Sequence, residues 1–132
     1  MTITQALLDS LTAQAKASAR LRMNYDLRNS PSDGSQRMLN AIEPGSPMPI
    51  HRHRQSSETV VCLRGRLVED FYDETGRRRT DSIELSPGGP NVAVNIPAGQ
   101  WHTVRILESG TVIMECKDGA YEPLGAEDVM EG

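Results

Sequence analysis

The sequence contains few aromatic residues: one Trp, one Phe and three Tyr among 132 residues. Aliphatic side chains must therefore fill the hydrophobic core, and little stacking surface is left for single-stranded nucleic acid. Basic residues are fewer than acidic ones: the chain has 14 Lys and Arg and 18 Asp and Glu, for a formal net charge of -4. A chain with this balance is poorly suited to neutralising a phosphate backbone, so we expect no nucleic-acid partner.

Cysteine is nearly absent. Cys62 and Cys116 are the only two, too few for a disulfide framework. Each lies within an apolar run, which predicts two small buried thiols in a reducing compartment. The sequence shows no basic start followed by an apolar leader, and no run long enough to span a bilayer. We therefore expect a cytoplasmic protein with no membrane partner.

The N-terminal part of the chain has apolar residues at helical spacing. Leu7, Leu8 and Leu11 share one face, and Thr4 is placed to cap the N-terminus of a helix. We expect residues 1–28 to form this helix and its lead-in, with the helix occupying about the first two dozen residues. Basic side chains near residues 16–22 would then suit the negative end of the helix dipole.

Short strand-like segments and turns containing Gly or Pro alternate over residues 35–118. About eight short strands of this kind predict an all-β fold, an antiparallel sandwich or barrel, in a single domain. The dense basic run 77–79 is expected at a solvated hairpin tip, and residues 119–132 as an exposed C-terminal tail. The clearest predicted strands cover residues 37–42, 58–63, 66–72, 79–85, 92–96, 102–107 and 111–117.

All three histidines of the chain fall into one pattern with a glutamate. His51 and His53 are two residues apart, so both can face one side of a strand, and Glu58 opens the next strand. His102 follows a turn signal at 97–99, and closure of a barrel would bring it to the same cavity. Three imidazoles and one carboxylate suit a divalent transition metal. The sequence therefore predicts a metal centre with the ligands His51, His53, Glu58 and His102.

Each of these residues also has an ordinary explanation. His102 beside Trp101 fits a half-buried histidine, the 51–54 segment fits an exposed basic loop, and Glu58 fits a charge at a strand edge. All of these explanations would have to hold together for the ligand pattern to be accidental, so metal binding is favoured. The ligand set accommodates Fe, Mn, Ni, Zn or Co. We expect an apolar wall around the site from Val60, Cys62, Val94, Ile96 and Val104.

Two motifs carry a family resemblance. Gly45-x5-His51-x-His53-x4-Glu58-x6-Gly65 resembles the first cupin motif, and Pro97-x-Gly99-x2-His102 resembles the core of the second. The second motif departs from the usual pattern at Asn91, where glycine is common, and at Ile106, where asparagine is frequent. Neither position supplies a metal ligand in cupins, so the departures bear on the specific activity and leave the expected ligand set unchanged.

The rest of the chain narrows this resemblance. The segments 20–24, 35–41, 96–104 and 115–121 are similar to the WbuC-type cupin metalloproteins, over nearly the whole chain. The resemblance implies a cupin jelly-roll barrel over residues 35–118 with a metal bound at the four predicted ligands. It also implies a bacterial setting linked to surface-polysaccharide gene clusters. It supplies no substrate.

Two functions fit these observations. The first is a metal-dependent enzyme, an isomerase or oxygenase acting on a small polar or sugar-derived molecule. The second is a non-catalytic module in which the metal orients a bound ligand or braces the barrel. Metal-free sugar epimerisation fits less well, because it needs a His base and a Tyr or Asp partner rather than a full ligand set. An open coordination position beside a pocket favours catalysis, whereas a closed shell favours a structural role.

No catalytic residue can be assigned from the sequence. Arg37, Asn40, Arg105 and Glu115 are candidates for contacts near a substrate, although each also fits an ordinary surface charge or strand-end polar residue. Arg37 and Asn40 are three apart, so at most one should face inward unless a bulge intervenes. We also expect a homodimer that pairs through a sheet edge.

Overall fold

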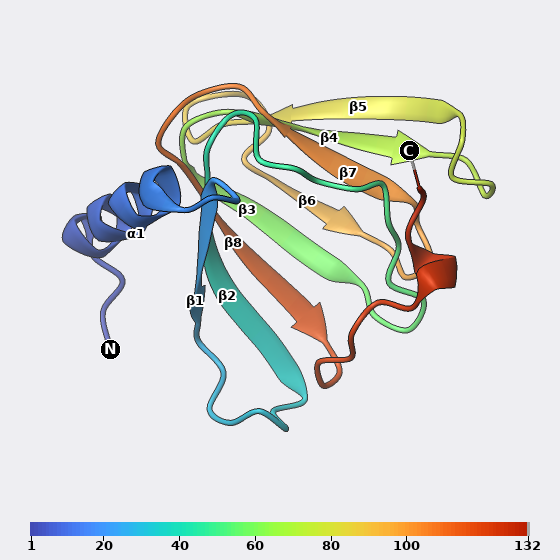
Figure 1. Cartoon of the computed structure of the whole chain (residues 1–132), viewed down its shortest axis with the longest axis horizontal. Coiled ribbons are helices and arrows are strands. Elements are labelled where there is room, and N and C mark those ends of the chain that lie inside the picture. Colours follow the sequence, from blue (N-terminus) through green and yellow to red (C-terminus); the bar gives the residue numbers. More distant parts are fainter. Residues whose placement is uncertain (132) are drawn as a thin grey trace.

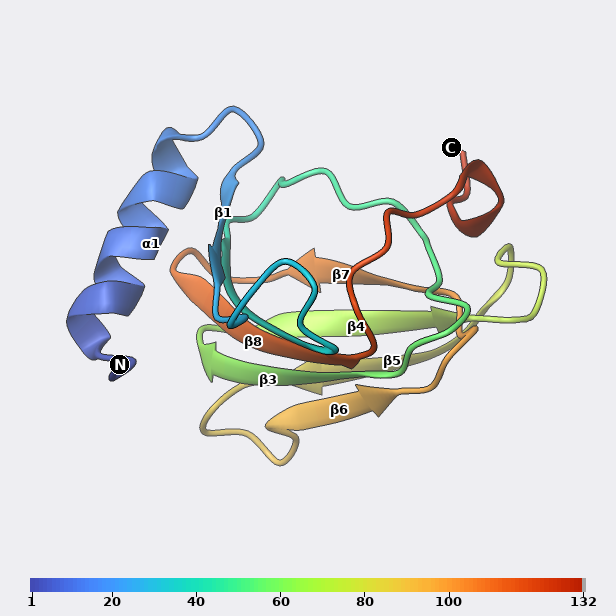
Figure 2. The same ribbon diagram turned by 90° about the horizontal axis from the view of Figure 1, so that it is seen from below.

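Two antiparallel β-sheets packed face to face form the body of the protein, as the computed structural model of residues 1–131 shows (Figures 1 and 2). One helix, α1 (Gln5–Ala17), lies outside the sheets. The five-stranded sheet has the order β1 (Arg22–Asp26), β2 (Ser35–Ile42), β8 (Thr111–Asp118), β3 (Glu58–Arg64) and β6 (Ala93–Ile96). The three-stranded sheet has the order β5 (Arg79–Leu85), β4 (Leu67–Tyr72) and β7 (His102–Ile106).

The main core lies between the two sheets because alternate side chains of each strand face inward. In β3 the buried positions are Glu58, Val60 and Cys62, two residues apart. Aliphatic residues dominate this core, as the scarcity of aromatics predicts. Val60, Cys62, Ile96 and Val104 of the expected apolar wall are buried in it and Val94 packs against it, but only Val104 also lines the cavity beside the histidines. The buried members of this core are Ile42, Val60, Cys62, Leu67, Phe71, Leu85, Ile96, Val104 and Ile113. Both cysteines are free, with Cys62 buried and Cys116 half-buried.

A second core joins the helix to the outer face of the five-stranded sheet. Leu8, Leu11 and Ala15 of α1 are buried against Leu39 of β2 and Val112 of β8. The predicted N-cap is confirmed: the backbone N–H of Leu7 donates to the Thr4 hydroxyl at 3.1 Å. The helix therefore covers the part of the outer face formed by β1, β2 and β8, and the inner face of the sheet is left to the interior of the sandwich (Figure 2).

The helix is shorter than the sequence predicts. It ends at Ala17, and residues 22–26 form the edge strand β1, which pairs with β2 in the register Arg22↔Ile42. Ser18 is extended and Leu21 has a φ of 55°, so the chain reverses direction between the two elements. Backbone pairing with β2 thus outweighs the helical spacing, and the basic residues at 20 and 22 do not lie at a helix terminus.

The C-terminal segment folds back onto the histidine-bearing segment. Its backbone pairs at Val129 with His51, and the N–H of Met130 donates to the carbonyl of Ile50 at 2.8 Å. A short 3-10 helix, η1 (Ala126–Asp128), precedes this contact (Figure 1). Most of residues 118–127 are exposed, and Gly132, the last residue of the predicted tail, lies outside the described residues. Within residues 1–131, no helix has the length and apolar character needed to cross a membrane.

Candidate metal centre

The structure brings the four predicted ligands together at one end of the barrel interior. One ligand atom from each of His51, His53, Glu58 and His102 lies within 4.8 Å of the corresponding atoms of the others. Glu58 opens β3 and His102 opens β7. Reciprocal backbone hydrogen bonds of 3.0 and 2.8 Å tie His51 directly to His102. The downstream imidazole thus reaches the upstream pair through main-chain pairing.

The imidazole rings are oriented by backbone carbonyls. Nδ1 of His51 lies 3.0 Å from the carbonyl oxygen of Pro49, and Nδ1 of His102 lies 3.0 Å from that of Gln100. A proton on each Nδ1 would donate to these carbonyls and leave Nε2 to bind a metal, and Nε2 of His102 already lies 2.8 Å from Oε1 of Glu58, a second predicted ligand. The Nε2 of His53 is buried and has no hydrogen-bond partner among the described residues. These features fit a bound cation, which would give the orphaned nitrogen a partner.

The protonation states of the site also suit metal binding. Burial lowers the pKa of His51, and burial together with the charge of Lys117 lowers the pKa of His53 to about 4. Burial alone would raise the pKa of Glu58, but the hydrogen bond with His102 and the Lys117 charge bring it down to about 2. Near neutral pH, His51 and His53 are therefore neutral and the carboxylate is ionised, the forms that coordinate a divalent metal.

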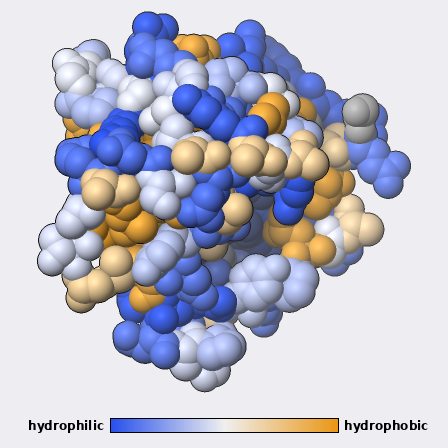
Figure 3. Space-filling view, turned by 60° about the vertical axis from the view of Figure 1, so that its left-hand side comes forward, coloured by the Kyte–Doolittle hydropathy of each residue, from blue (hydrophilic) through white to orange (hydrophobic). Residues whose placement is uncertain are grey.

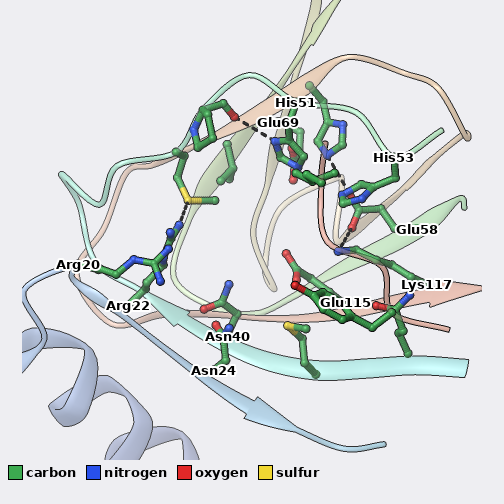
Figure 4. A pocket seen from close by; sticks show the side chains of 18 of the residues that line it. Arg20, Arg22, Asn24, Asn40, His51, His53, Glu58, Glu69, Glu115 and Lys117 are labelled. Carbon is green, nitrogen blue, oxygen red and sulfur yellow. Dashed lines mark hydrogen bonds and ion pairs between the residues drawn. The ribbon is translucent and has the colours of Figure 1, made fainter. Parts of the chain in front are cut away.

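A cavity of about 590 Å³ opens beside the histidines (Figure 4). Glu69 of β4, Glu115 and Lys117 of β8, and Asn40 of β2 line its walls. Asn40 Oδ1 and Glu69 Oε2 are buried and have no hydrogen-bond partner within residues 1–131. Burial raises the pKa of Glu69 well above its usual value, and burial together with the Glu58 charge raises that of Glu115 to about 7. The cavity thus offers hydrogen-bonding groups close to a potential metal site.

The four further candidates divide into two pairs. Asn40 and Glu115 line the cavity. Arg37 and Arg105 do not: Arg37 contacts Asp33 at 3.3 Å, and Arg105 donates to the buried Asp70 at 2.6 Å. The expectation that at most one of Arg37 and Asn40 faces inward is thus confirmed, and Asn40 is the one.

Sequence reasoning did not identify several other residues of the cavity. Lys117 could have been predicted from the sequence, because it follows Glu115 by two residues and therefore lies on the same strand face. Glu69 is an acidic residue inside an apolar strand, a signal of a special environment. Arg20 and Arg22 gave no such signal because that segment was expected to be helical.

The sequence matches over residues 3–85 the family described as "Domain of unknown function (DUF6016)". The chain belongs to this family. The match covers more than half of the DUF6016 chain, including the first three predicted ligands, while His102 lies beyond it. No match was found among curated protein sequences.

Solved structures similar to this DUF6016 protein share its fold. KdgF from Halomonas sp. matches with a TM-score of 0.59 and 14% identity, over 76% of this chain and 82% of that one. CapF, a capsular polysaccharide assembling protein from Staphylococcus aureus, matches with a TM-score of 0.61 and 22% identity, over 86% of this chain. An oxalate oxidase, solved in complex with the substrate analogue glycolate, matches with a TM-score of 0.60 and 16% identity, over 79% of this chain.

The present chain spans 32% of the CapF chain and 53% of the oxalate oxidase chain. At these identities the likeness concerns the fold alone, which is a cupin-type jelly roll with an N-terminal helix, as predicted. The binding of a metal by the four assembled side chains stays a prediction.

Proposed function

We propose that this protein is a metal-dependent enzyme of the WbuC-type cupins that acts on a small polar or sugar-derived molecule in bacterial surface-polysaccharide metabolism. The observation that carries the proposal is the open cavity beside the three histidines and Glu58. A purely structural metal needs no such cavity, whereas a substrate does. The described role of CapF in capsular polysaccharide assembly is consistent with a saccharide-related substrate.

The residues around the cavity suit polar chemistry. A divalent metal, when bound, would act as a Lewis acid that polarises a carbonyl or hydroxyl group of the substrate. Glu115, with its pKa raised to about 7, is placed to hold or release a proton near neutral pH, and burial raises the pKa of the neighbouring cavity residue Glu69 well above its usual value. Val104 contributes apolar surface to the wall. This combination suits an isomerase or an oxygenase.

Elemental analysis of the native protein, coupled to a metabolite-binding screen, tests the proposal. We expect about one equivalent of Fe, Mn, Ni, Zn or Co per chain, and sugar-derived ligands that bind the loaded protein but not the chelator-treated protein. The variant His51→Ala/His53→Ala should contain only background metal. Native protein without a transition metal, or a variant that keeps its full content, would contradict the proposed function.

A non-catalytic binding module is the second candidate. The observation in its favour is the number of protein ligands, because four side chains can close a tetrahedral shell as in structural sites. The coordination number of the loaded metal separates the two candidates. An X-ray absorption spectrum with one or two water ligands in addition to the protein ligands favours the enzyme, and a spectrum without water ligands favours the module.

Two further expectations accompany the proposal. We expect a cytoplasmic protein, which fractionation of the source cells tests. We also expect a homodimer, because β1 forms an edge of the larger sheet and pairs only with β2 within residues 1–131. Light scattering at several concentrations tests the oligomeric state.

A further inference from the structure

Two arginines form the end of the cavity opposite the histidines (Figure 4). Arg20 is exposed, and Arg22 is half-buried, with its Nη1 donating to the carbonyl of Pro47 at 3.1 Å and lying 2.7 Å from Sδ of Met48. Neither guanidinium forms a salt bridge with a carboxylate in the described part of the chain. Two positive charges without a protein counter-ion therefore border the cavity.

The backbone that presents this pair is strained and held in place. Leu21, between the two arginines, has a φ of 55°, a conformation that costs a residue with a side chain about 1 kcal/mol or more. Its N–H donates to Ser18, and its carbonyl accepts from the N–H of Glu43 at 2.8 Å. The hydroxyl of Ser46 donates to the carbonyl of Arg20 at 2.7 Å. Strain maintained by several hydrogen bonds is characteristic of functional segments.

Polar groups without partners lie elsewhere on the cavity wall. Asn40 Oδ1 and Glu69 Oε2 belong to side chains that are 7% and 3% exposed, and neither atom has a hydrogen-bond partner among residues 1–131. Orphaned buried polar atoms are costly, and a bound ligand with hydroxyl groups would satisfy them. The cavity volume of about 590 Å³ lies within the range of small-molecule sites, about 300–1,000 Å³.

We propose that the cavity selects an anionic sugar, a sugar acid or sugar phosphate, whose negative group binds Arg20 and Arg22 while its hydroxyl groups reach Asn40, Glu69 and the histidine end. This inference rests on the proposed function and gives it a substrate class. Guanidinium groups bind carboxylates and phosphates with paired, charge-assisted hydrogen bonds. A divalent metal held with a single Glu58 carboxylate adds net positive charge at the other end. At the arginine end of the cavity, an anionic compound therefore gains charge-assisted hydrogen bonds that its neutral parent sugar lacks.

Isothermal titration calorimetry of the metal-loaded protein tests the inference with three compounds that differ only at carbon 6: glucose, glucuronate and glucose 6-phosphate. The corresponding galactose series is measured in parallel. We expect at least one anionic compound to bind about tenfold or more tightly than its neutral parent. The preferred anion distinguishes a carboxylate from a phosphate ligand.

The variants Arg20→Gln and Arg22→Gln should each weaken binding of the anionic compound about tenfold and leave the affinity for the neutral sugar unchanged. Arg78→Gln is the matched control, since Arg78 is exposed on the β4–β5 hairpin and should have no effect. Metal content and circular dichroism report whether each variant is folded. If Arg22→Gln fails to fold, Arg20→Gln decides, because the exposed Arg20 side chain makes no hydrogen bond in the described structure.

The outcomes separate this inference from the proposed function. Equal affinity for anionic and neutral sugars, no binding of any of the six compounds, or unchanged affinity in both arginine variants would overturn the anionic class. Metal content is measured in the same samples. Native protein that lacks metal overturns the proposed function, whereas metal-loaded protein without a preference for anions overturns only the inference drawn from the arginines.

Discussion

Replacing Asp128 with asparagine should weaken metal binding although Asp128 is not a ligand. His51 and His53 line the cavity, whereas Arg52 and Arg54, which alternate with them along the chain, contact the C-terminal segment instead. Asp128 Oδ1 accepts from Nε of Arg52 at 3.0 Å and from Nε of Arg54 at 2.6 Å. One carboxylate of the C-terminal segment thus holds the 51–54 segment, which carries two predicted ligands.

The expected magnitude follows from the exposure of these ion pairs. The side chains of Arg52 and Arg54 are 24% and 49% exposed, and that of Asp128 is 14% exposed. Partly exposed pairs of this kind contribute about 0.2–1 kcal/mol each. Asparagine keeps the shape and one acceptor oxygen, so the total loss should be about 1 kcal/mol. If the lost ion-pair energy makes the 51–54 segment more mobile, ordering this segment on metal binding costs the same free energy, and the Kd for metal should rise about fivefold.

Competition with a chromophoric chelator at fixed pH measures the Kd of native protein and of Asp128→Asn. Asp81→Asn is the matched control, because Asp81 is exposed on β5 and accepts only from the N–H of Ser82 among the described residues. An Asp128→Asn protein with a lower Tm but an unchanged Kd would refute the reasoning. In that case the C-terminal segment stabilises the fold without positioning the ligands.

Three further predictions concern metal removal, pH and backbone strain. Chelator treatment should lower the Tm, because metal bound only to the folded state stabilises it, and the Tm of His51→Ala/His53→Ala should not respond to chelator. Since burial raises the folded-state pKa of Glu69 above 4.5, its ionisation destabilises the fold as pH rises. Glu69→Gln should therefore stabilise the chelator-treated protein by about 1 kcal/mol at pH 8 and by less at pH 4 in urea unfolding. Gly65→Ala should lose on the order of 3 kcal/mol, because Gly65 has a φ of 79° and an added Cβ would lie 2.7 Å from Cα of Thr111.

Each of these predictions has a control within the chain. Equal effects of chelator on native protein and on the double histidine variant would contradict metal binding at the cluster. Glu74→Gln, at an exposed hairpin position, should show no pH-dependent gain, and an equal gain there would remove the special role of burial at Glu69. Gly99→Ala shares the positive φ of Gly65 but has open space for a Cβ, so it should lose only about 1 kcal/mol. Equal losses at the two glycines would show that the close contact with Thr111 contributes nothing.

The parts of the site that the sequence predicts depend on local regularities. Side chains two positions apart share a strand face, which is enough to predict that His51 and His53 point the same way and that Arg37 and Asn40 do not. The same rule, applied to β8, places Lys117 with Glu115. Strand positions followed from alternation and from turns containing Gly and Pro, because those signals lie in the segments themselves.

The parts that could not be predicted depend on contacts between distant segments. The turn at Leu21 needs a backbone conformation that leucine rarely adopts, and the sequence contains no glycine or asparagine at this position that would predict it. Hydrogen bonds from the 43–46 segment maintain that turn, and the pairing of β1 with β2 replaces the expected last turns of helix. The contact of Asp128 with Arg52 likewise joins residues 76 positions apart. Contacts of this kind produce no periodic pattern in the sequence from which they could be predicted.

The two ends of the cavity come from different parts of the chain, so sharing the barrel fold does not determine which substrate binds. The histidine end of the cavity is built from β3, β7 and the segment before them, within the barrel that the similar structures share at 14–22% identity. The opposite end is built from Arg20, in the turn before β1, and Arg22, the first residue of β1, and the cavity lining also includes Tyr121 from the segment after β8. Selectivity for an anionic ligand should then depend on residues 18–24, since this segment supplies the two arginines of the cavity. Exchanging residues 18–24 should change which sugar binds while leaving metal affinity unchanged, and it is there that proteins with this barrel can diverge in substrate.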